Sequence, residues 1–345
     1  MDMSFEVIRG DTPGLEWRFP VLRFRPEGPT SGPKVYLQAG LHAGELPGPG
    51  VLHLLAGHLR RARADGRLLS EITLVPMANP IGLNQDLFGG LQGRFDLATR
   101  TNFNRCFPLP DKPLPEHRAL GAVARLKARL LELASGADIV LDLHCDDVSL
   151  QYAYVPAVLW PAMTDLAQAL DCAAVLVWED GSDGAFEEAA LAPLLTLPAD
   201  ELTTKVVSTV ELRGLADVGA DLAEKDAAGL MRFLEGRGAL AGGWRPDKTW
   251  SGLAVPLHNI EMVRSPIGGT VWFDVIPGDK VTEGQRLARV LHAPGEENGV
   301  TEVHAPQAGT VITRVSQQLV RPGGDLVKLA GLVPSRNFRP GALES

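Results

Sequence analysis

A histidine and a glutamate three residues apart follow the first strongly apolar run of the chain. The run covers residues 35–39 between a proline and a glycine, which is typical of a buried strand. His42 and Glu45 come next, in a glycine-containing loop before a helix expected at about 49–64. Imidazole nitrogen and carboxylate oxygen are both zinc ligands, so the pair is a candidate part of a zinc site. Taken alone, such a pair is more often a solvated loop or the start of a helix.

Two further expected strands carry residues that could complete this site. The apolar run at 138–143 leads into His144, and the run at 206–212 contains the single acid Glu211. In an open parallel sheet, ligands bind beyond the carboxyl ends of the strands. His144 would then join the first pair as a third ligand, which leaves a fourth position open for water. Glu211 would be in place as a general base.

Each of these residues also has a purely structural interpretation. His144 could be a strand-end histidine bonded to backbone. Asp142 shares a strand face with His144, so it could accept an imidazole N–H or pair with an arginine in the core. Glu211 could form a salt bridge with Arg213.

The elements that must position these residues alternate between strand and helix. A strand, a helix and a second strand at 72–77 make a β-α-β unit, which predicts a doubly wound, mixed and mostly parallel sheet. Residues 1–34 are expected to form an edge hairpin. Further helices are expected at about 115–134, 160–170, 185–194 and 216–236, with a strand at 174–178.

A long segment without clear periodicity interrupts this alternation at residues 81–113. Structureless loops of this length are uncommon inside a compact domain and are usually functional. The segment is rich in polar side chains, which include Arg94, Arg100, Asn102, Asn104 and Arg105.

The pattern changes near residue 250, where short strands and glycine turns replace the helices. Residues 265–271 are echoed at 305–311, which predicts a small two-fold β-barrel or sandwich. We therefore expect a catalytic domain at 1–250 and an all-β domain at 251–345. The latter resembles a biotinyl/lipoyl barrel-sandwich, but its hairpin at 292–299 has no lysine for a cofactor. A lid, a substrate gate or an oligomer contact is the expected role.

Composition narrows the possible partners. The 345 residues are 45% hydrophobic and 22% charged, with a formal net charge of -9, which argues against nucleic acid. Three cysteines without paired spacing indicate a reducing compartment. With no signal peptide pattern and no apolar run of about 18 residues, we expect a cytoplasmic protein without membrane contact, possibly a homo-oligomer.

Five short motifs occur in a characteristic order over about residues 35–215. They are His42-Ala43-Gly44-Glu45, Asn79-Pro80, Asn104-Arg105-Cys106-Phe107-Pro108, Asp142-Leu143-His144 and Thr209-Val210-Glu211. In this order they closely resemble the succinylglutamate desuccinylase/aspartoacylase family, a branch of the zinc carboxypeptidase fold. The trailing β domain also agrees with that family.

The resemblance implies roles for individual residues. One Zn2+ per chain would be bound by His42, Glu45 and His144, with Glu211 as general base. Arg105 would polarise the scissile carbonyl. The substrate contacts would come from Asn104, from Asn79 and from one of two upstream arginines, Arg100 or Arg94. Members of the family that read an acyl carboxylate have an arginine before the base, and residues 201–205 contain none.

The expected function is therefore zinc-dependent hydrolysis of the amide bond of a small N-acyl amino acid. A metallocarboxypeptidase acting on short peptides is the alternative within the hydrolases. A catalytically silent binding protein of the same fold is the alternative from another class.

Overall fold

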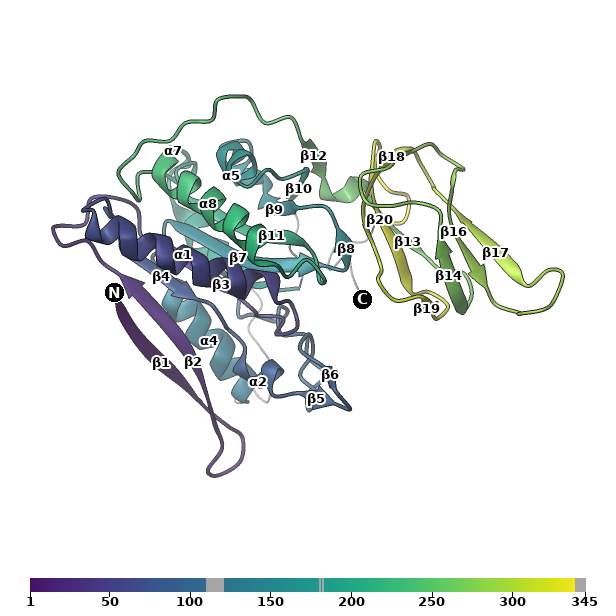
Figure 1. Ribbon diagram of the computed structural model, residues 1–345, viewed down its shortest axis with the longest axis horizontal. Helices are drawn as coiled ribbons and strands as arrows, with labels where there is room; N and C mark the ends of the chain where they lie inside the picture. The colour runs from purple at the N-terminus through teal and green to yellow at the C-terminus, as the bar shows by residue number, and fades with distance from the viewer. Residues whose placement is uncertain (110–120, 180, 182, 339–345) are drawn as a thin grey trace.

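A large mixed sheet forms the body of the computed structural model, which describes residues 1–109, 121–179, 181 and 183–338 (Figure 1). Five of its eight strand-to-strand contacts are parallel, so the predicted mixed, mostly parallel sheet is confirmed. In spatial order its strands are β1 (Asp2–Arg9), β2 (Glu16–Phe24), β4 (Ile72–Val75), β3 (Val35–Ala39), β7 (Ile139–Asp146), β11 (Val206–Gly214), β9 (Tyr152–Pro156), β10 (Ala174–Trp178) and β12 (Leu253–Pro256).

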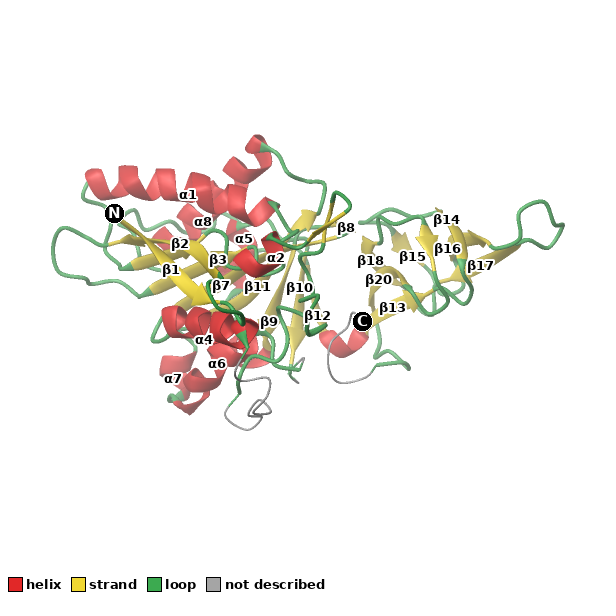
Figure 2. Ribbon diagram, turned by 90° about the horizontal axis from the view of Figure 1, so that it is seen from below, coloured by secondary structure: helices red, strands yellow, loops and turns green. Residues whose placement is uncertain are grey.

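Helices cover both faces of this sheet, as a doubly wound fold requires (Figure 2). One face carries α1 (Pro47–Ala64), α5 (Thr164–Ala169) and α8 (Ala220–Gly236), and the other carries α4 (Ala122–Ala134), α6 (Phe186–Leu191) and α7 (Ala199–Leu202). The first part of the helix predicted from residue 115 lies outside the described residues. None of the helices described is both long and apolar enough to cross a bilayer.

Helix α1 shows how the sequence sets a buried face. A proline stands in its first turn, where no intrahelical N–H is needed. Val51, Leu52, Leu55 and Leu59 recur at helical spacing and are all buried. The helix connects β3 to its parallel neighbour β4, which is the crossover that the sequence predicts.

Strand β9 is an element that the sequence analysis does not predict. It lies between β11 and β10 and runs antiparallel to β11. Its five residues carry two tyrosines and end at a proline, so the run is too short to show a clear period. The strand matters for the site because Tyr152 is the direct neighbour of Glu211.

The C-terminal part of the chain forms two small antiparallel sheets around a core of its own. The first contains β13 (Ile260–Arg264), β20 (Asp325–Gly331), β18 (Gly309–Arg314) and β15 (Lys280–Val281), and the second β17 (Val300–His304), β16 (Arg286–Leu291), β14 (Gly269–Phe273) and β19 (Leu319–Val320). The two echoed segments lead into β14 and β18. Because β12 still belongs to the large sheet, the chain leaves that sheet after Pro256, slightly beyond the predicted boundary at 250.

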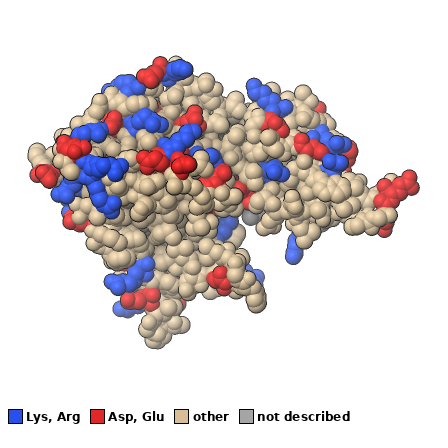
Figure 3. Space-filling model, in the orientation of Figure 1, with Lys and Arg blue, Asp and Glu red and all other residues tan. Residues whose placement is uncertain are grey.

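The two parts of the chain are joined by a short strand, β8 (Val148–Ser149), which follows β7 directly and pairs with β18. The β16–β17 hairpin, by contrast, points away from the large sheet (Figure 1). On the face shown in Figure 3, lysine and arginine are interspersed with acidic residues over both parts of the molecule.

Candidate active site

Three adjacent strands at the centre of the large sheet carry the predicted site. Strand β7 lies between β3 and β11 and is parallel to both. The loop after β3 holds His42 and Glu45, and His144 lies near the end of β7. Glu211 on β11 is in direct register with His144. The carboxyl ends of these strands therefore bring together four residues that are far apart in the sequence.

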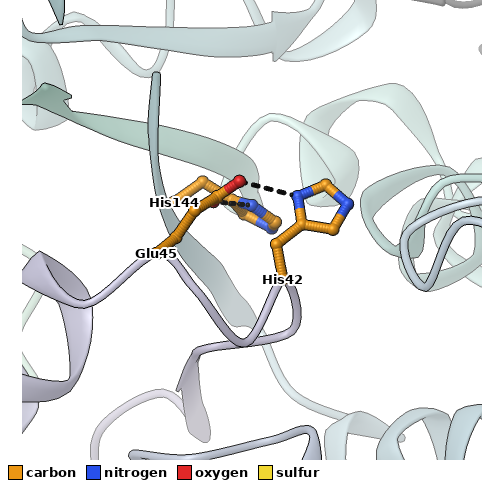
Figure 4. A group of neighbouring side chains, drawn as sticks. All are labelled: His42, Glu45 and His144. Carbon is orange, nitrogen blue, oxygen red and sulfur yellow. Dashed lines mark hydrogen bonds and ion pairs between the residues drawn. The ribbon is translucent and has the colours of Figure 1, made fainter. Parts of the chain in front are cut away.

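The side chains of His42, Glu45 and His144 point toward one another (Figure 4). Glu45 lies between the histidines, with Oε1 2.9 Å from Nδ1 of His42 and Oε2 2.7 Å from Nδ1 of His144. All three residues are buried, and one ligand atom from each lies within 4.8 Å of the others. The group could hold a metal ion.

The outer nitrogens of both imidazoles are occupied by acceptors. Nε2 of His42 lies 2.8 Å from Oδ1 of Asn102, an oxygen that also accepts the backbone N–H of Asn104. Nε2 of His144 lies 2.9 Å from Oδ2 of Asp142. Each Nε2 must therefore donate its proton outward, as ligand histidines usually do. The inner nitrogens then present lone pairs to Glu45 unless they also carry protons.

The charges in this group differ between the two histidines. Burial lowers the pKa of His42, although Glu45 opposes this shift. The pKa of His144 is raised well above its usual value because Asp142 and Glu45 outweigh its burial. The pKa of Glu45 is held well below its usual range by both histidines, against its burial. An ionised Glu45 thus faces a neutral His42, two acceptors at 2.9 Å. A cation between them removes this conflict, so the donor set fits a metal.

Glu211 stands beside this group with one oxygen unused. Its Oε2 is buried and has no hydrogen-bond partner among the described residues. Burial raises its pKa well above the usual glutamate value, with Glu45 and Asp146 adding to the shift. No salt bridge joins Glu211 to Arg213 in the described part of the chain. Arg213 instead pairs with the buried Asp226.

The described part of the long segment at 81–113 brings two polar residues, Arg94 and Asn102, into contact with the candidate ligands. Nη1 of Arg94 lies 3.4 Å from Oε1 of Glu45. Oδ1 of Asn104 accepts the backbone N–H of Phe186 at the start of α6, and Nη1 of Arg105 donates to the carbonyl of Asn104. Asn102, to which the sequence analysis assigned no role, bonds a candidate ligand. Its spacing just before the Asn104-Arg105 motif is the signal that could have pointed to it.

Two other predicted substrate contacts lie elsewhere in the structure. Asn79 is fully buried, donates to the carbonyl of Leu41 and caps helix α2 (Pro80–Leu83) through Gly82. Its observed contacts hold the loop that carries His42. Arg100 is exposed in a turn closed by Asp96. Substrate binding by either residue stays a prediction.

Gly93 packs against the backbone of the loop that carries His42 and Glu45. Gly93 follows the small hairpin of β5 (Asp86–Leu87) and β6 (Gly90–Leu91), and its carbonyl accepts the N–H of Ala43. A Cβ at this position would come within 2.4 Å of the backbone nitrogen of Gly44. Any larger residue at position 93 would therefore displace the loop between His42 and Glu45.

A cavity of about 260 Å³ opens beside the group, between the large sheet and the β domain. Its volume is close to the lower end of the range for small-molecule sites, which is about 300 Å³. The large sheet and its loops contribute Glu45, Arg94 and Asp146, among others. The β domain contributes residues from β13, β18 and β20, including Arg314 and Lys328. Both parts of the chain thus build the space next to the candidate metal group.

Known proteins resemble this chain in sequence and in fold. A model of the succinylglutamate desuccinylase/aspartoacylase catalytic domain matches residues 31–237. The chain belongs to this family. The match contains the candidate ligands, Glu211 and the long loop, and it ends before the β domain.

Relatives of this family extend the similarity to nearly the whole chain. The N-alpha-acetyl-L-2,4-diaminobutyric acid deacetylase of Halomonas elongata is 27% identical over 323 residues, which are 90% of this chain and 84% of the relative. A solved family member from Shewanella amazonensis SB2B is 28% identical with a TM-score of 0.82, covering 96% of this chain and 98% of that one. The product-bound ectoine utilization protein EutE (DoeB) from Ruegeria pomeroyi shares the fold, with a TM-score of 0.73 and 20% identity. The match covers 96% of this chain and 94% of that one.

Proposed function

We propose that this protein is a zinc-dependent amidohydrolase that removes the acyl group from a small N-acyl amino acid. The observation that carries the proposal is the buried group of His42, Glu45 and His144, in which a carboxylate faces a neutral imidazole and a cation is needed between them. Membership of a deacylase family and similarity to a deacetylase of an acetylated diamino acid support the same reaction.

Zinc suits a set of two imidazoles and one carboxylate with an open fourth position. When bound there, the ion supplies Lewis acidity for a carbonyl and lowers the pKa of water toward about 7. The outward hydrogen bonds to Asn102 and Asp142 fix the ring orientation of both histidines, so the inner nitrogens are presented for binding.

Glu211 is the proposed general base. Its buried, unpartnered Oε2 is available to take a proton from the attacking water and to return it to the leaving amine. A carboxylate whose pKa is raised by burial holds that proton more firmly than an ordinary glutamate does. Arg105 is the proposed donor to the developing oxyanion. Of the two upstream arginines, we propose that Arg94 contacts substrate because it reaches the ligand Glu45.

The cavity favours a small substrate over a peptide. It measures about 260 Å³ and is walled on one side by the β domain. An N-acyl amino acid fits such a space. Together with the similarity to a deacetylase, this fit supports deacylation over a metallocarboxypeptidase activity.

The test combines metal analysis with a substrate panel. The wild-type protein should contain about one zinc per chain and release free amine from N-acetyl or N-succinyl amino acids. Release of C-terminal residues from short peptides instead would indicate a carboxypeptidase. Bound zinc without any turnover would indicate a silent binding protein.

Two variants separate the ligand role from the base role. Glu211→Gln should keep its zinc and lose about 10²- to 10⁴-fold in kcat, since a general base contributes that much. His144→Ala should lose zinc itself. Glu261→Gln is the matched control, because Glu261 is also buried but bonds Gln307 and Ser335 in the β domain. Near-normal turnover by the Glu211 variant would remove this residue from the mechanism.

A further inference from the structure

We propose that Arg314, on strand β18 of the β domain, binds a carboxylate of the substrate and thereby sets specificity. This inference rests on the proposed function and adds a recognition residue from outside the catalytic domain. It starts from the cations that line the cavity beside Glu45. These are Arg94, Lys328 and Arg314.

Two of these cations already have acidic partners. Arg94 lies 3.4 Å from Glu45, and Nζ of Lys328 lies 2.7 Å from Oδ2 of Asp146. Arg314 is different, since no carboxylate pairs with it anywhere in the described part of the chain. Its side chain lines the cavity, and no carboxylate of the described residues balances its charge. An anion in the cavity would pair with the guanidinium.

The guanidinium is held in place without that anion. Its Cζ lies 4.9 Å from the ring centroid of Phe273, a stacking contact that limits its rotation. The backbone of Arg314 pairs with Val148 on β8, only a few residues after His144 on the same continuous segment. The β ladder therefore ties the position of Arg314 to the strand that carries a candidate metal ligand.

A carboxylate is the ligand that this arrangement suits. A guanidinium presents parallel N–H groups that match the two oxygens of a carboxylate. The acids of the cavity wall are engaged elsewhere: Asp146 by Lys328, Asp147 by Ser316, Asp325 by Arg264 and Glu45 by the histidines. An N-acyl amino acid has at least an α-carboxylate on its amino-acid half, and an N-succinyl compound has a further carboxylate on its acyl half.

The experiment measures how much the enzyme prefers a charged substrate. Two comparisons of kcat/KM are made. The first compares an N-acetyl amino acid with the same compound in which an α-carboxamide replaces the α-carboxylate. The second compares the N-acetyl with the N-succinyl derivative of one amino acid. In one of the two comparisons, the wild type should have the higher kcat/KM for the substrate with the additional carboxylate. In Arg314→Gln this ratio of kcat/KM values should fall about 10- to 100-fold, mainly through a higher KM. Loss in the amide comparison assigns the α-carboxylate, and loss in the succinyl comparison assigns the acyl carboxylate.

Arg289→Gln is the matched control. Arg289 also lies on the β domain and stacks on an aromatic ring, 5.6 Å from the centroid of Trp272, but it bonds Asp274 and does not line the cavity. Its variant should keep the wild-type preference. Arg314→Lys, which keeps the charge but not the fork, should fall between, and it provides a second measurement if the Gln variant unfolds. An unchanged preference in both Arg314 variants overturns the inference.

A binding measurement separates this inference from the proposed function. If the wild type hydrolyses no N-acyl amino acid, the proposed function fails, and calorimetric titration with N-acetyl amino acids and their carboxamides takes over. Tighter binding of the acid by the wild type, lost in Arg314→Gln, supports the inference. Equal binding of acid and carboxamide by the wild type overturns it.

Discussion

Strand β7 takes part in two clusters of charged residues, a buried one at His144 and a half-buried one at Asp146, and the two have opposite characters. At His144, the carboxylates of Glu45 and Asp142 surround imidazoles, and Oδ1 of Asp142 has no partner among the described residues. At Asp146, every contact is between a donor and an acceptor. Its Oδ2 accepts from Lys328, Tyr152 and Thr313 at 2.7–2.8 Å, and its Oδ1 accepts a backbone N–H.

The two clusters differ in role: the one at His144 is the candidate metal group, and the one at Asp146 connects the β domain to the large sheet, so we call it the joint. The cluster at Asp146 is complete with groups of the protein alone, and two of its donors, Lys328 and Thr313, come from the β domain. It fastens that domain to the large sheet. In the cluster at His144, the ionised Glu45 and the neutral His42 are two acceptors that face each other, and a cation between them would remove this conflict. Charge is therefore paired within the protein in one place and fits an added cation in the other.

The variant with the largest expected effect is Lys328→Met, which should lower the free energy of unfolding. Lys328 is only 2% exposed, and its removal leaves the half-buried Asp146 without its cation. Breaking a fully buried pair destabilises by about 3–5 kcal/mol, and the partial exposure of Asp146 favours the lower end, about 3 kcal/mol. We expect the free energy of unfolding, measured with denaturant, to fall by this amount. Lys280→Met, at an exposed position of the same domain, should change it little. An unchanged stability of the Lys328 variant would show that the joint lies elsewhere.

A smaller effect is expected at the candidate metal group from Asn102→Ala. The variant removes the acceptor of the outer N–H of His42 without touching a ligand atom. Loss of such a contact typically lowers metal affinity about 10- to 100-fold. Competition with a chromophoric chelator measures this directly. Asn298→Ala, exposed on the β16–β17 hairpin, is the control. The free energy of unfolding of the metal-free protein should fall less than in Lys328→Met.

The smallest effect is a change in thiol accessibility. Cys145 lies between the two clusters on β7 and is buried, as is Cys172. Burial raises the pKa of Cys172 to about 12, so this thiol stays protonated and unreactive at pH 8. Both should resist alkylation in the wild type. In Lys328→Met, Cys145 alone should gain reactivity, as read by mass spectrometry. If Cys172 reacts equally fast, the variant has unfolded globally and the joint is not local.

The centre of the sheet could be predicted from the sequence because strand ends in a parallel sheet meet at one edge. His42, Glu45, His144 and Glu211 each follow or end an apolar run, and that pattern is local. Tertiary register is not local. The pairing of β8 with β18, the position of Lys328 and the hydrogen bond from His42 to Asn102 all depend on it.

The same reason explains the missed elements. Strand β9 is held by its neighbours β10 and β11 rather than by a period of its own. In the sequence, strand β12 resembles the start of the β domain because it is a short apolar strand of four residues. Its pairing with β10 places it in the large sheet instead. The sequence pattern thus changes near residue 250, a few residues before the chain leaves the large sheet.

The ladder between β8 and β18 has a consequence for engineering. Because one wall of the cavity is contributed from the C-terminal third of the chain through a fixed register, selectivity should be transplantable. A chimera that keeps Val148–Ser149 of this protein and receives a relative's C-terminal module would inherit the donor's choice of substrate along with the donor's residue at position 314.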